Sequence, residues 1–364
     1  MSGNPFTPSF GKIPAIMAGR SRIIQEMEQA LLSNGGDPNL CSLFSGPRGV
    51  GKTVLLSYLS NHATKLGWIS ANVTARPGML EDIIERATEA ANELASSKRE
   101  ARITSLSVPT LFSISWEYRD PASGNWRTRM NKLLDVLEAH DIGLLITIDE
   151  IDPELDELID FSATYQHFVR EDRRVALLMA GLPARISSLL SDKSVSFLRR
   201  ASQHHIGRIA DHDVRDAFRA TIAEAGKGID NDALAILVRA TDGFAYMMQL
   251  AGFRTWGCSH EGTIHADEAS RGAELARQDF INGVIVKTIR ELSAGDLAFL
   301  EAMLPDESGL SAMSDIAERM GKTAGYARVY RTRLVEQGVI DTPTRGHVAF
   351  SMPLLRDYLL RDID

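Results

Sequence analysis

The sequence predicts an α/β fold in which a parallel sheet is covered by helices on both faces and is followed by two smaller regions. Between residues 40 and 210, short apolar runs alternate with helical stretches, a pattern typical of such sheets. From residue 211 to 292 the apolar spacing indicates helices only. After Ser293 the order becomes three helices, two short strands and a last helix, which predicts a winged helix-turn-helix.

Three domains follow from this reading, with boundaries at 1–210, 211–292 and 293–364. A chain of 364 residues is too long for one ordinary core, so several domains are expected. Near-continuous apolar runs, as doubly covered strands require, help to place five strands at 40–44, 68–74, 144–148, 175–180 and 204–209. Residues 103–116 alternate and are expected to form an inserted hairpin. In the second domain, helices are expected at 213–225, 231–240, 246–256 and 267–291.

The composition favours a cytoplasmic globular protein without a membrane span. No apolar run approaches the roughly 20 residues of a membrane helix, and the first residues lack the basic and apolar regions of a signal peptide. Cys41 and Cys258 lie far apart, so neither a disulfide nor a zinc site is expected, and Cys41 is interpreted as a core residue. The net charge of -8 argues against a surface that binds nucleic acid everywhere. Any DNA contact is therefore expected on one element.

A glycine-rich segment connects the first predicted strand to a helical stretch. Residues 46–53 read GPRGVGKT, which places the pattern G-x-x-x-x-G-K-[ST] in the strand-loop-helix context of a phosphate-binding loop. In such loops, glycines let backbone N–H groups turn toward phosphate oxygens, and the helix N-terminus adds positive potential. Lys52 is expected to neutralise the β- and γ-phosphates of ATP, and the Thr53 hydroxyl to bind Mg²⁺. The predicted nucleotide-binding residues are Gly46, Pro47, Arg48, Gly49, Val50, Gly51, Lys52 and Thr53.

An acidic pair follows the predicted strand at 144–148. Carboxylates at the carboxyl edge of a parallel sheet lie where such folds bind ligands. Asp149 is expected to hold Mg²⁺ beside Thr53, and Glu150 to orient and deprotonate the attacking water, which makes Lys52, Asp149 and Glu150 catalytic candidates. Asp152 precedes Pro153 and is interpreted as the N-cap of the next helix.

With these two motifs, the chain resembles the AAA+ P-loop ATPases, and within them the bacterial and archaeal branch related to origin-recognition-type and STAND ATPases. The resemblance covers nearly the whole length. Residues 16–20, IMAGR, look like the element that touches adenine in this family, which implies that Gly19 and Arg20 contact the nucleotide. A turn and helix start before Ser21 is an equal alternative.

The resemblance also implies an arginine finger at Arg200, because residues 196–200, SFLRR, match the segment that supplies it. Such an arginine reaches the γ-phosphate of a neighbouring subunit, which implies ATP-dependent self-association. An ordinary surface salt-bridge partner is the alternative. Residues 179–183, MAGLP, lack the polar sensor that ends the fourth strand in such families.

Residues 241–249, TDGFAYMMQ, resemble the segment at which the helical lid approaches the nucleotide. Ala245 replaces the family's proline, and no arginine stands where other AAA+ proteins carry their second sensor. Both departures place the chain nearer the STAND side, which implies slow ATP hydrolysis that serves as a conformational switch. The apolar spacing of Phe244, Met247 and Leu250 also predicts ordinary core packing.

The predicted recognition helix at 324–337 suggests double-stranded DNA as a partner. At 3.6 residues per turn, Ala327, Tyr330 and Leu334 are expected to face the core, while Arg328 points outward with Arg331 on its flank. Arg345 lies in the expected wing. The acidic stretch at 306–318 opposes DNA binding if it faces the duplex. A signalling switch whose winged helix binds protein is therefore the alternative function.

Overall fold

The computed structural model describes residues 3–9, 11–33, 35–101, 124–260 and 262–361, and the predicted hairpin at 103–116 lies outside them. The chain forms two compact units. The sheet unit contains residues 20–45 and 52–205, and the lid unit contains residues 1–19, 46–51 and 206–364. The predicted division into three domains stays a prediction.

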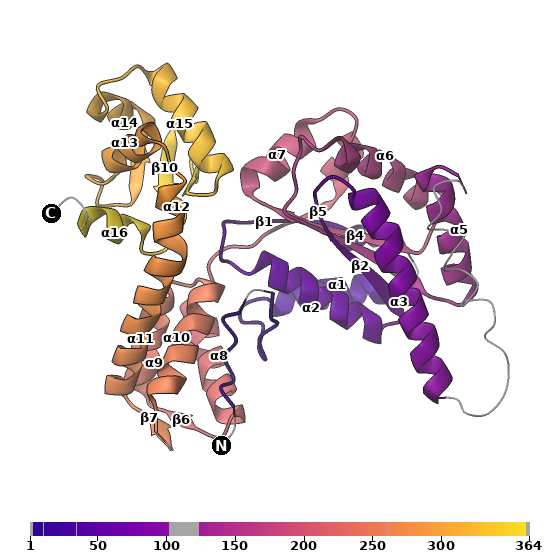
Figure 1. The fold of residues 1–364 in the computed structure, drawn as a ribbon, viewed down its shortest axis with the longest axis horizontal. Coiled ribbons are helices and arrows are strands. Elements are labelled where there is room, and N and C mark those ends of the chain that lie inside the picture. Colours follow the sequence, from indigo (N-terminus) through magenta and orange to yellow (C-terminus); the bar gives the residue numbers. More distant parts are fainter. Residues whose placement is uncertain (1–2, 10, 34, 102–123, 261, 362–364) are drawn as a thin grey trace. The chain divides into compact units, whose positions relative to one another are not determined.

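The sheet unit is built on a five-stranded sheet with the order β2-β3-β4-β1-β5 (Figure 1). All neighbouring strands are parallel, as predicted. The strands are β1 (Cys41–Ser45), β2 (Trp68–Thr74), β3 (Gly143–Asp149), β4 (Val175–Gly181) and β5 (Ser202–His205). The predicted strand at 204–209 was wrong in position. Its apolar residues Ile206 and Ile209 are buried, but they belong to the lid unit, so their apolar character reflects packing there.

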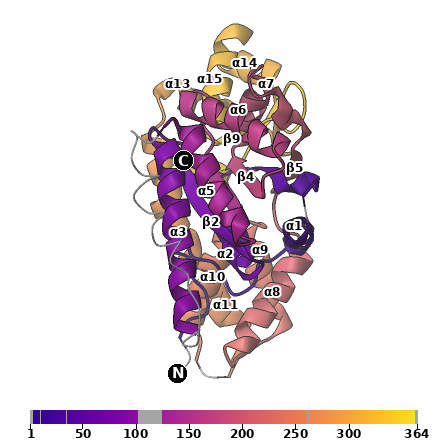
Figure 2. The same cartoon turned by 90° about the vertical axis from the view of Figure 1, so that its right-hand side faces the viewer.

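Helices cover both faces of the sheet. One face carries α1 (Ser21–Leu32) and α2 (Lys52–Lys65). The other carries α3 (Met79–Ala101), α5 (Trp126–Ala139), α6 (Asp156–Arg170) and α7 (Pro183–Ser191), whose apolar residues join those of the strands in one core. Figure 2 shows α3 and α5 side by side. Cys41 packs partly buried against this core, and its burial raises the pKa of the thiol to about 12.

The lid unit begins with a helical bundle made of α8 (Asp211–Glu224), α9 (Asn231–Thr241), α10 (Ala245–Cys258) and α11 (Ala266–Phe280). The long helix expected at 267–291 is present, but a π-helical turn, η4 (Ile281–Ile285), separates α11 from α12 (Val286–Arg290). The expectation of helices alone was wrong. Two short strands, β6 (Gly228–Ile229) and β7 (Thr263–Ile264), pair in parallel. With two residues each, they are too short to show the alternation of apolar and polar residues that predicts a strand.

The N-terminal segment lies along α10. The Phe6 ring packs so closely on Gly252 that a β-carbon there would lie 2.4 Å from the ring. The backbone N–H of Thr7 donates to Gln249 (3.0 Å), and the Asn4 amide donates to the Phe253 carbonyl (3.0 Å). These contacts hold residues 4–7 on the bundle.

The C-terminal elements are α13 (Ala294–Met303), β8 (Leu310–Ala312), α14 (Met313–Arg319), α15 (Ala324–Glu336), β9 (Ile340–Asp341), β10 (His347–Phe350) and α16 (Leu355–Arg361). Their antiparallel sheet has the order β8-β10-β9. The strand β8, between the first and second of the three predicted helices, was not predicted, and α15 lies at the place of the predicted recognition helix. Ala327 and Leu334 are buried as expected, whereas Tyr330 is only half-buried because it packs at the edge, on Gly295.

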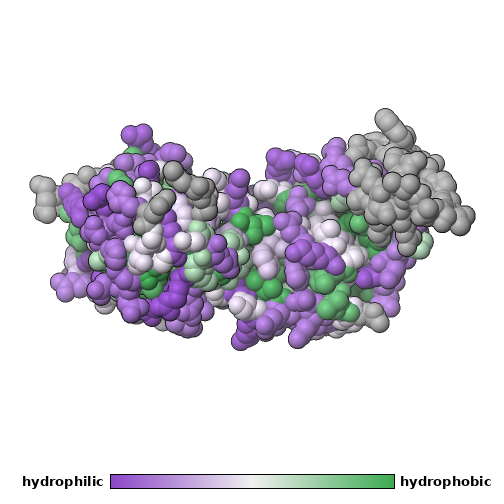
Figure 3. Space-filling view, turned by 90° about the horizontal axis from the view of Figure 1, so that it is seen from below, coloured by the Kyte–Doolittle hydropathy of each residue, from purple (hydrophilic) through white to green (hydrophobic). Residues whose placement is uncertain are grey.

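Across the described residues, none of the helices combines the length and apolar character needed to span a membrane. On the face drawn in Figure 3, hydrophilic residues surround small groups of hydrophobic ones.

Candidate functional site

The side chains of Thr53 and Asp149 meet in the sheet unit. Thr53 lies in the first turn of α2, and Asp149 is the last residue of β3. The Thr53 hydroxyl donates a hydrogen bond of 2.5 Å to Asp149 Oδ2. Hydroxyl and carboxylate oxygens are the ligands that Mg²⁺ prefers, and the two oxygens lie close enough to bind one ion together. The residues present therefore fit a magnesium site.

A polar network holds the β3 end of this pair in position. Thr147, buried within β3, donates to Asn72 Oδ1 on β2 (2.8 Å), and Asn72 in turn donates to Ser60 Oγ on α2 (2.9 Å). The network thus ties both strands to the helix that carries Thr53. Sequence reasoning missed it, although a threonine inside the apolar run LLITI is a signal, because a buried hydroxyl needs a partner.

Glu150 has a strained backbone. Its φ of 53° lies in the left-handed region, which costs free energy for a residue with a β-carbon. Hydrogen bonds on both sides hold it there: its own N–H donates to Asp149 Oδ1 (2.9 Å), and the N–H of Ile151 donates to the Ala180 carbonyl (3.1 Å). The side chain is exposed beside Asp149, and its role as a catalytic base stays a prediction.

The loop at 46–51 joins β1 to α2, which confirms the predicted strand-loop-helix context. Gly49 and Gly51 adopt φ values of 80° and 93°, and a β-carbon at Gly46 would lie 2.2 Å from the Ile206 carbonyl oxygen. Glycine is thus required by conformation at two positions and by space at the third. Arg48 is exposed, Pro47 is half-buried, and Val50 is buried.

The first turn of α10 supports this loop. The N–H of Tyr246 donates to the Gly49 carbonyl (3.2 Å), and a β-carbon at Gly51 would lie 3.3 Å from that of Ala245. Gly243 is needed just before, because a β-carbon there would lie 2.7 Å from the Ile209 carbonyl oxygen. The segment 241–249, singled out by its resemblance, therefore packs directly on the phosphate-binding loop.

The structure places Gly19 and Arg20 at the start of α1. Gly19 has a φ of 65° and lies against Ile209 and Asp213 in the lid unit. Arg20 is buried, and its side chain does not cap the helix. Their contact with a nucleotide stays a prediction.

Arg200 ends the 3-10 helix η3 (Ser196–Arg200) and is exposed. Its side chain has no ion pair or hydrogen bond within the described part of the chain, whereas the neighbouring Arg199 donates to the Leu190 carbonyl (2.7 Å). The role of Arg200 as an arginine finger stays a prediction.

The prediction for Asp152 was wrong. α6 begins at Asp156, with Leu155 as its N-cap. Asp152 instead starts a turn that contains Pro153: its carboxylate accepts from the Glu154 N–H (3.3 Å) and lies 3.7 Å from Arg185. The turn delays the start of the helix by three residues, from 153 to 156.

The basic candidates for DNA binding lie on α15 and in the loop after β9. Arg328 and Arg345 are exposed, and Arg331 is half-buried. In the ranges that the structure describes, none of these three side chains has an ion pair. Arg333 differs, since it lies 3.1 Å from the buried carboxylate of Asp296 on α13.

The acidic stretch near the predicted recognition helix is partly neutralised. Arg319 binds both carboxylate oxygens of Asp306, each at 2.7 Å. This pairing lowers the pKa of Asp306 from 3.8 to about 2. Asp315 and Glu318 on α14 stay exposed.

Comparisons with known proteins agree with this architecture. A family model described as "Domain of unknown function (DUF8462)" matches residues 282–359. No curated protein matches the chain. The Walker-type ATPase PABY2304 of Pyrococcus abyssi is 13% identical with a TM-score of 0.66, over 94% of this chain and 95% of that one. The Aeropyrum pernix ORC2 protein in its ADPNP-ADP complexes is 14% identical with a TM-score of 0.64, over 98% and 96%. The chain therefore has the fold of these two proteins, with a parallel sheet covered by helices on both faces, as predicted.

Proposed function

We propose that this chain binds ATP with Mg²⁺ and hydrolyses it slowly to ADP and phosphate. The observation that carries the proposal is the meeting of Thr53 and Asp149 beside the phosphate-binding loop sequence. Lys52, at the start of α2, neutralises the β- and γ-phosphates, and Glu150 orients the attacking water and accepts its proton. Mg²⁺, held by Thr53 and Asp149, would stabilise the charge that develops on the phosphate oxygens.

The comparisons support nucleotide chemistry. The Pyrococcus abyssi protein is described as a Walker-type ATPase, and the Aeropyrum pernix ORC2 protein was solved with ADPNP and ADP. These descriptions concern those proteins, and the residues above extend them to this chain.

Slow ATP turnover follows from two differences between this sequence and those of the AAA+ proteins that it resembles. β4 ends in Ala180 and Gly181, so it offers no polar side chain to the γ-phosphate. The first turn of α10, which packs on the phosphate-binding loop, carries no arginine. Because fewer groups stabilise the transition state, ATP hydrolysis is slow. The bound nucleotide then sets the conformation of the chain and does not drive rapid cycles of hydrolysis.

Phosphate release from ATP by the purified chain, in Mg²⁺ and in EDTA, tests this function. We expect slow release that requires Mg²⁺. Equal release in EDTA would contradict the assigned metal site, and ATP that neither binds nor turns over would contradict the proposal.

We further propose that residues 293–364 form a winged helix that binds double-stranded DNA through α15. Support comes from Arg328, Arg331 and Arg345, which have no ion pair among the described residues. On the exposed first turn of α15, a β-carbon at Gly325 would meet only Thr323 Oγ1, at 3.9 Å, and the absence of a side chain there lets a ligand approach the helix backbone. Pairing with Arg319 also reduces the repulsion that Asp306 would exert on phosphates.

A second candidate is a signalling switch whose winged helix binds protein. The same outward surface of α15 exposes Val329 (57%) and Tyr326 (39%), which is unusual for large apolar side chains and typical of protein contacts. Gel retardation of duplex DNA at low salt, with and without ATP, separates the two functions. Retardation supports DNA binding, and its absence with ATP-loaded protein supports the protein partner.

A further inference from the structure

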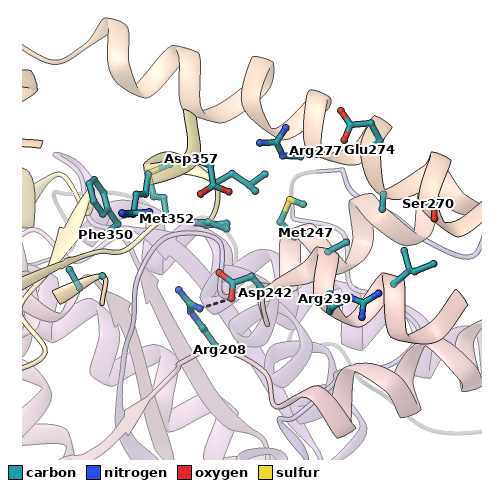
Figure 4. A pocket seen from close by; sticks show the side chains of 18 of the residues that line it. Arg208, Arg239, Asp242, Met247, Ser270, Glu274, Arg277, Phe350, Met352 and Asp357 are labelled. Atoms are coloured by element: carbon teal, nitrogen blue, oxygen red, sulfur yellow. Dashed lines mark hydrogen bonds and ion pairs between the residues drawn. The ribbon is translucent and has the colours of Figure 1, made fainter. Parts of the chain in front are cut away.

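A polar cavity of about 840 Å³ lies within the lid unit. Its wall combines α9 and α11 of the bundle with β10 and α16 of the C-terminal elements. Figure 4 shows Arg239, Arg277 and Glu274 from the bundle, and Phe350, Met352 and Asp357 from the C-terminal elements, around this space. It shares no lining residue with the segments 19–20 and 46–53.

Four guanidinium groups line the cavity, and they differ in how they are satisfied. Arg208 is paired with Asp242 at 2.5 Å. Arg239 and Arg277 have no ion pair or side-chain hydrogen bond with any residue that the structure describes. Arg356 donates one N–H to the Leu304 carbonyl (2.9 Å), but its buried Nε finds no acceptor among the same residues. These three guanidinium groups come from three helices; Arg239 is exposed, whereas Arg277 and Arg356 are half-buried. Together they favour an anion with several oxygens.

The rest of the lining narrows the class of ligand. Asp357 faces the same space and is a hydrogen-bond acceptor, so a bare anion would be repelled on that side. Glu274 already accepts from Gln278 (3.1 Å). Met247, Phe350 and Met352 add an apolar surface. A ligand that combines a phosphate, hydroxyl groups and an apolar part can contact the guanidinium groups, the Asp357 carboxylate and the apolar side chains of the cavity together.

Backbone strain occurs in the same wall. Asp242 and Leu354 both line the cavity with positive φ values, 46° and 63°. A leucine in this region is costly, and residues held in such conformations cluster at ligand-binding sites.

From these observations we propose that the cavity lined by Arg239, Arg277 and Arg356 binds a phosphorylated sugar or nucleotide, as a second site that is independent of the phosphate-binding loop. Its guanidinium groups hold the phosphate, and Asp357 accepts hydrogen bonds from hydroxyl groups. Because the wall joins bundle helices to C-terminal elements, the bound ligand would stabilise their packing.

Calorimetric titration of the full chain with AMP or ribose 5-phosphate tests this site in the background Lys52→Ala. AMP lacks the β- and γ-phosphates that Lys52 is assigned to hold. Both probes are expected to bind, and adding Arg239→Gln with Arg277→Gln should weaken binding by at least about tenfold, since charge-assisted hydrogen bonds are lost. Arg271→Gln is the matched control, because Arg271 is exposed on α11 but does not line the cavity. Adenosine, which has no phosphate, should bind more weakly than AMP.

The proposal is overturned if neither probe binds the Lys52→Ala chain, or if the double glutamine variant binds as tightly as its parent. Equal loss of binding in Arg271→Gln would also overturn it, because general charge would then explain the binding. A double variant that loses only DNA affinity would identify a DNA contact instead. The ATPase proposal fails separately, if Lys52→Ala leaves ATP binding unchanged.

Discussion

The hydroxyl of Thr53 and the carboxylate of Asp149 are joined by a 2.5 Å hydrogen bond, although 96 positions separate them in the sequence. The bond links the start of α2 to the end of β3. It brings two oxygen ligands from different elements within reach of one cation. Glu150 follows directly, held in its strained conformation by the other oxygen of Asp149. The roles proposed for Lys52 and Glu150 depend on this pair, because both residues are adjacent to it in the sequence.

Glu150→Gln should separate ATP binding from hydrolysis. Glutamine keeps the size and hydrogen bonding of the side chain but cannot accept the proton of water, so turnover should fall by about a hundredfold or more. ATP affinity should change little, and bound ATP should persist. Single-turnover hydrolysis with radiolabelled ATP measures both quantities. Unchanged turnover would remove Glu150 from its role.

The nucleotide loop could be predicted from sequence because its determinants are local. The motif from Gly46 to Thr53 follows one strand directly and leads directly into a helix, so a single continuous segment contains both the motif and its structural context. Asp149 could be placed beside it because parallel strands end at one edge of the sheet.

Features that depend on tertiary contacts were not predictable. The Thr147–Asn72–Ser60 network joins three elements, and no single segment contains its pattern. The predicted strand at 204–209 was misplaced because Ile206 and Ile209 are apolar for packing in the lid unit. The cavity near Arg277 combines residues from five elements, α9, α10, α11, β10 and α16, and no single segment contains its pattern.

Arg200 should act in trans. If it reaches the γ-phosphate of a neighbouring subunit, Arg200→Ala should lower hydrolysis by up to about a thousandfold while ATP affinity is retained. ATP should also promote self-association of the wild-type chain. Mixing Arg200→Ala with Lys52→Ala chains should restore part of the activity, since one supplies an intact pocket and the other an intact arginine. A monomeric protein with normal turnover in Arg200→Ala would exclude the finger.

Replacing Arg328 and Arg331 with alanine should weaken DNA binding. Each lost phosphate contact should lower the slope of affinity against salt concentration by about one, so the double variant should lose about two. ATP hydrolysis should be unaffected, because α15 contributes no residue to the nucleotide site. Fluorescence anisotropy with labelled duplex DNA at several salt concentrations measures the slope. Arg271→Ala is the control, and an unchanged slope in the double variant would place the DNA contact elsewhere.

His204 should make the stability of the chain sensitive to mild acid. Its ring stacks on Phe44 (centroids 5.0 Å apart), and burial lowers the pKa of the imidazole below 6.5, with Glu26 opposing and Arg22 adding to the effect. Below pH 6.5 the unfolded chain therefore takes up a proton that the folded chain resists. Stability should fall as the pH drops through this value, until the folded histidine is itself protonated.

His204→Phe keeps the stacking but removes this titration, so its denaturation midpoint should depend less on pH than that of the wild type. Urea unfolding between pH 7.5 and 5.5 gives the comparison. Parallel pH profiles for the two proteins would show that His204 does not contribute.

The most direct test of the nucleotide site is equilibrium binding of Mg·ATP to the wild-type chain and to Lys52→Ala. The side chain of Lys52 is assigned to the β- and γ-phosphates, and its removal leaves their charge uncompensated. We predict that the wild-type chain binds Mg·ATP and that Lys52→Ala loses this binding while it retains the fold, as judged by circular dichroism. A folded Lys52→Ala chain that binds Mg·ATP as tightly as the wild type would contradict the account.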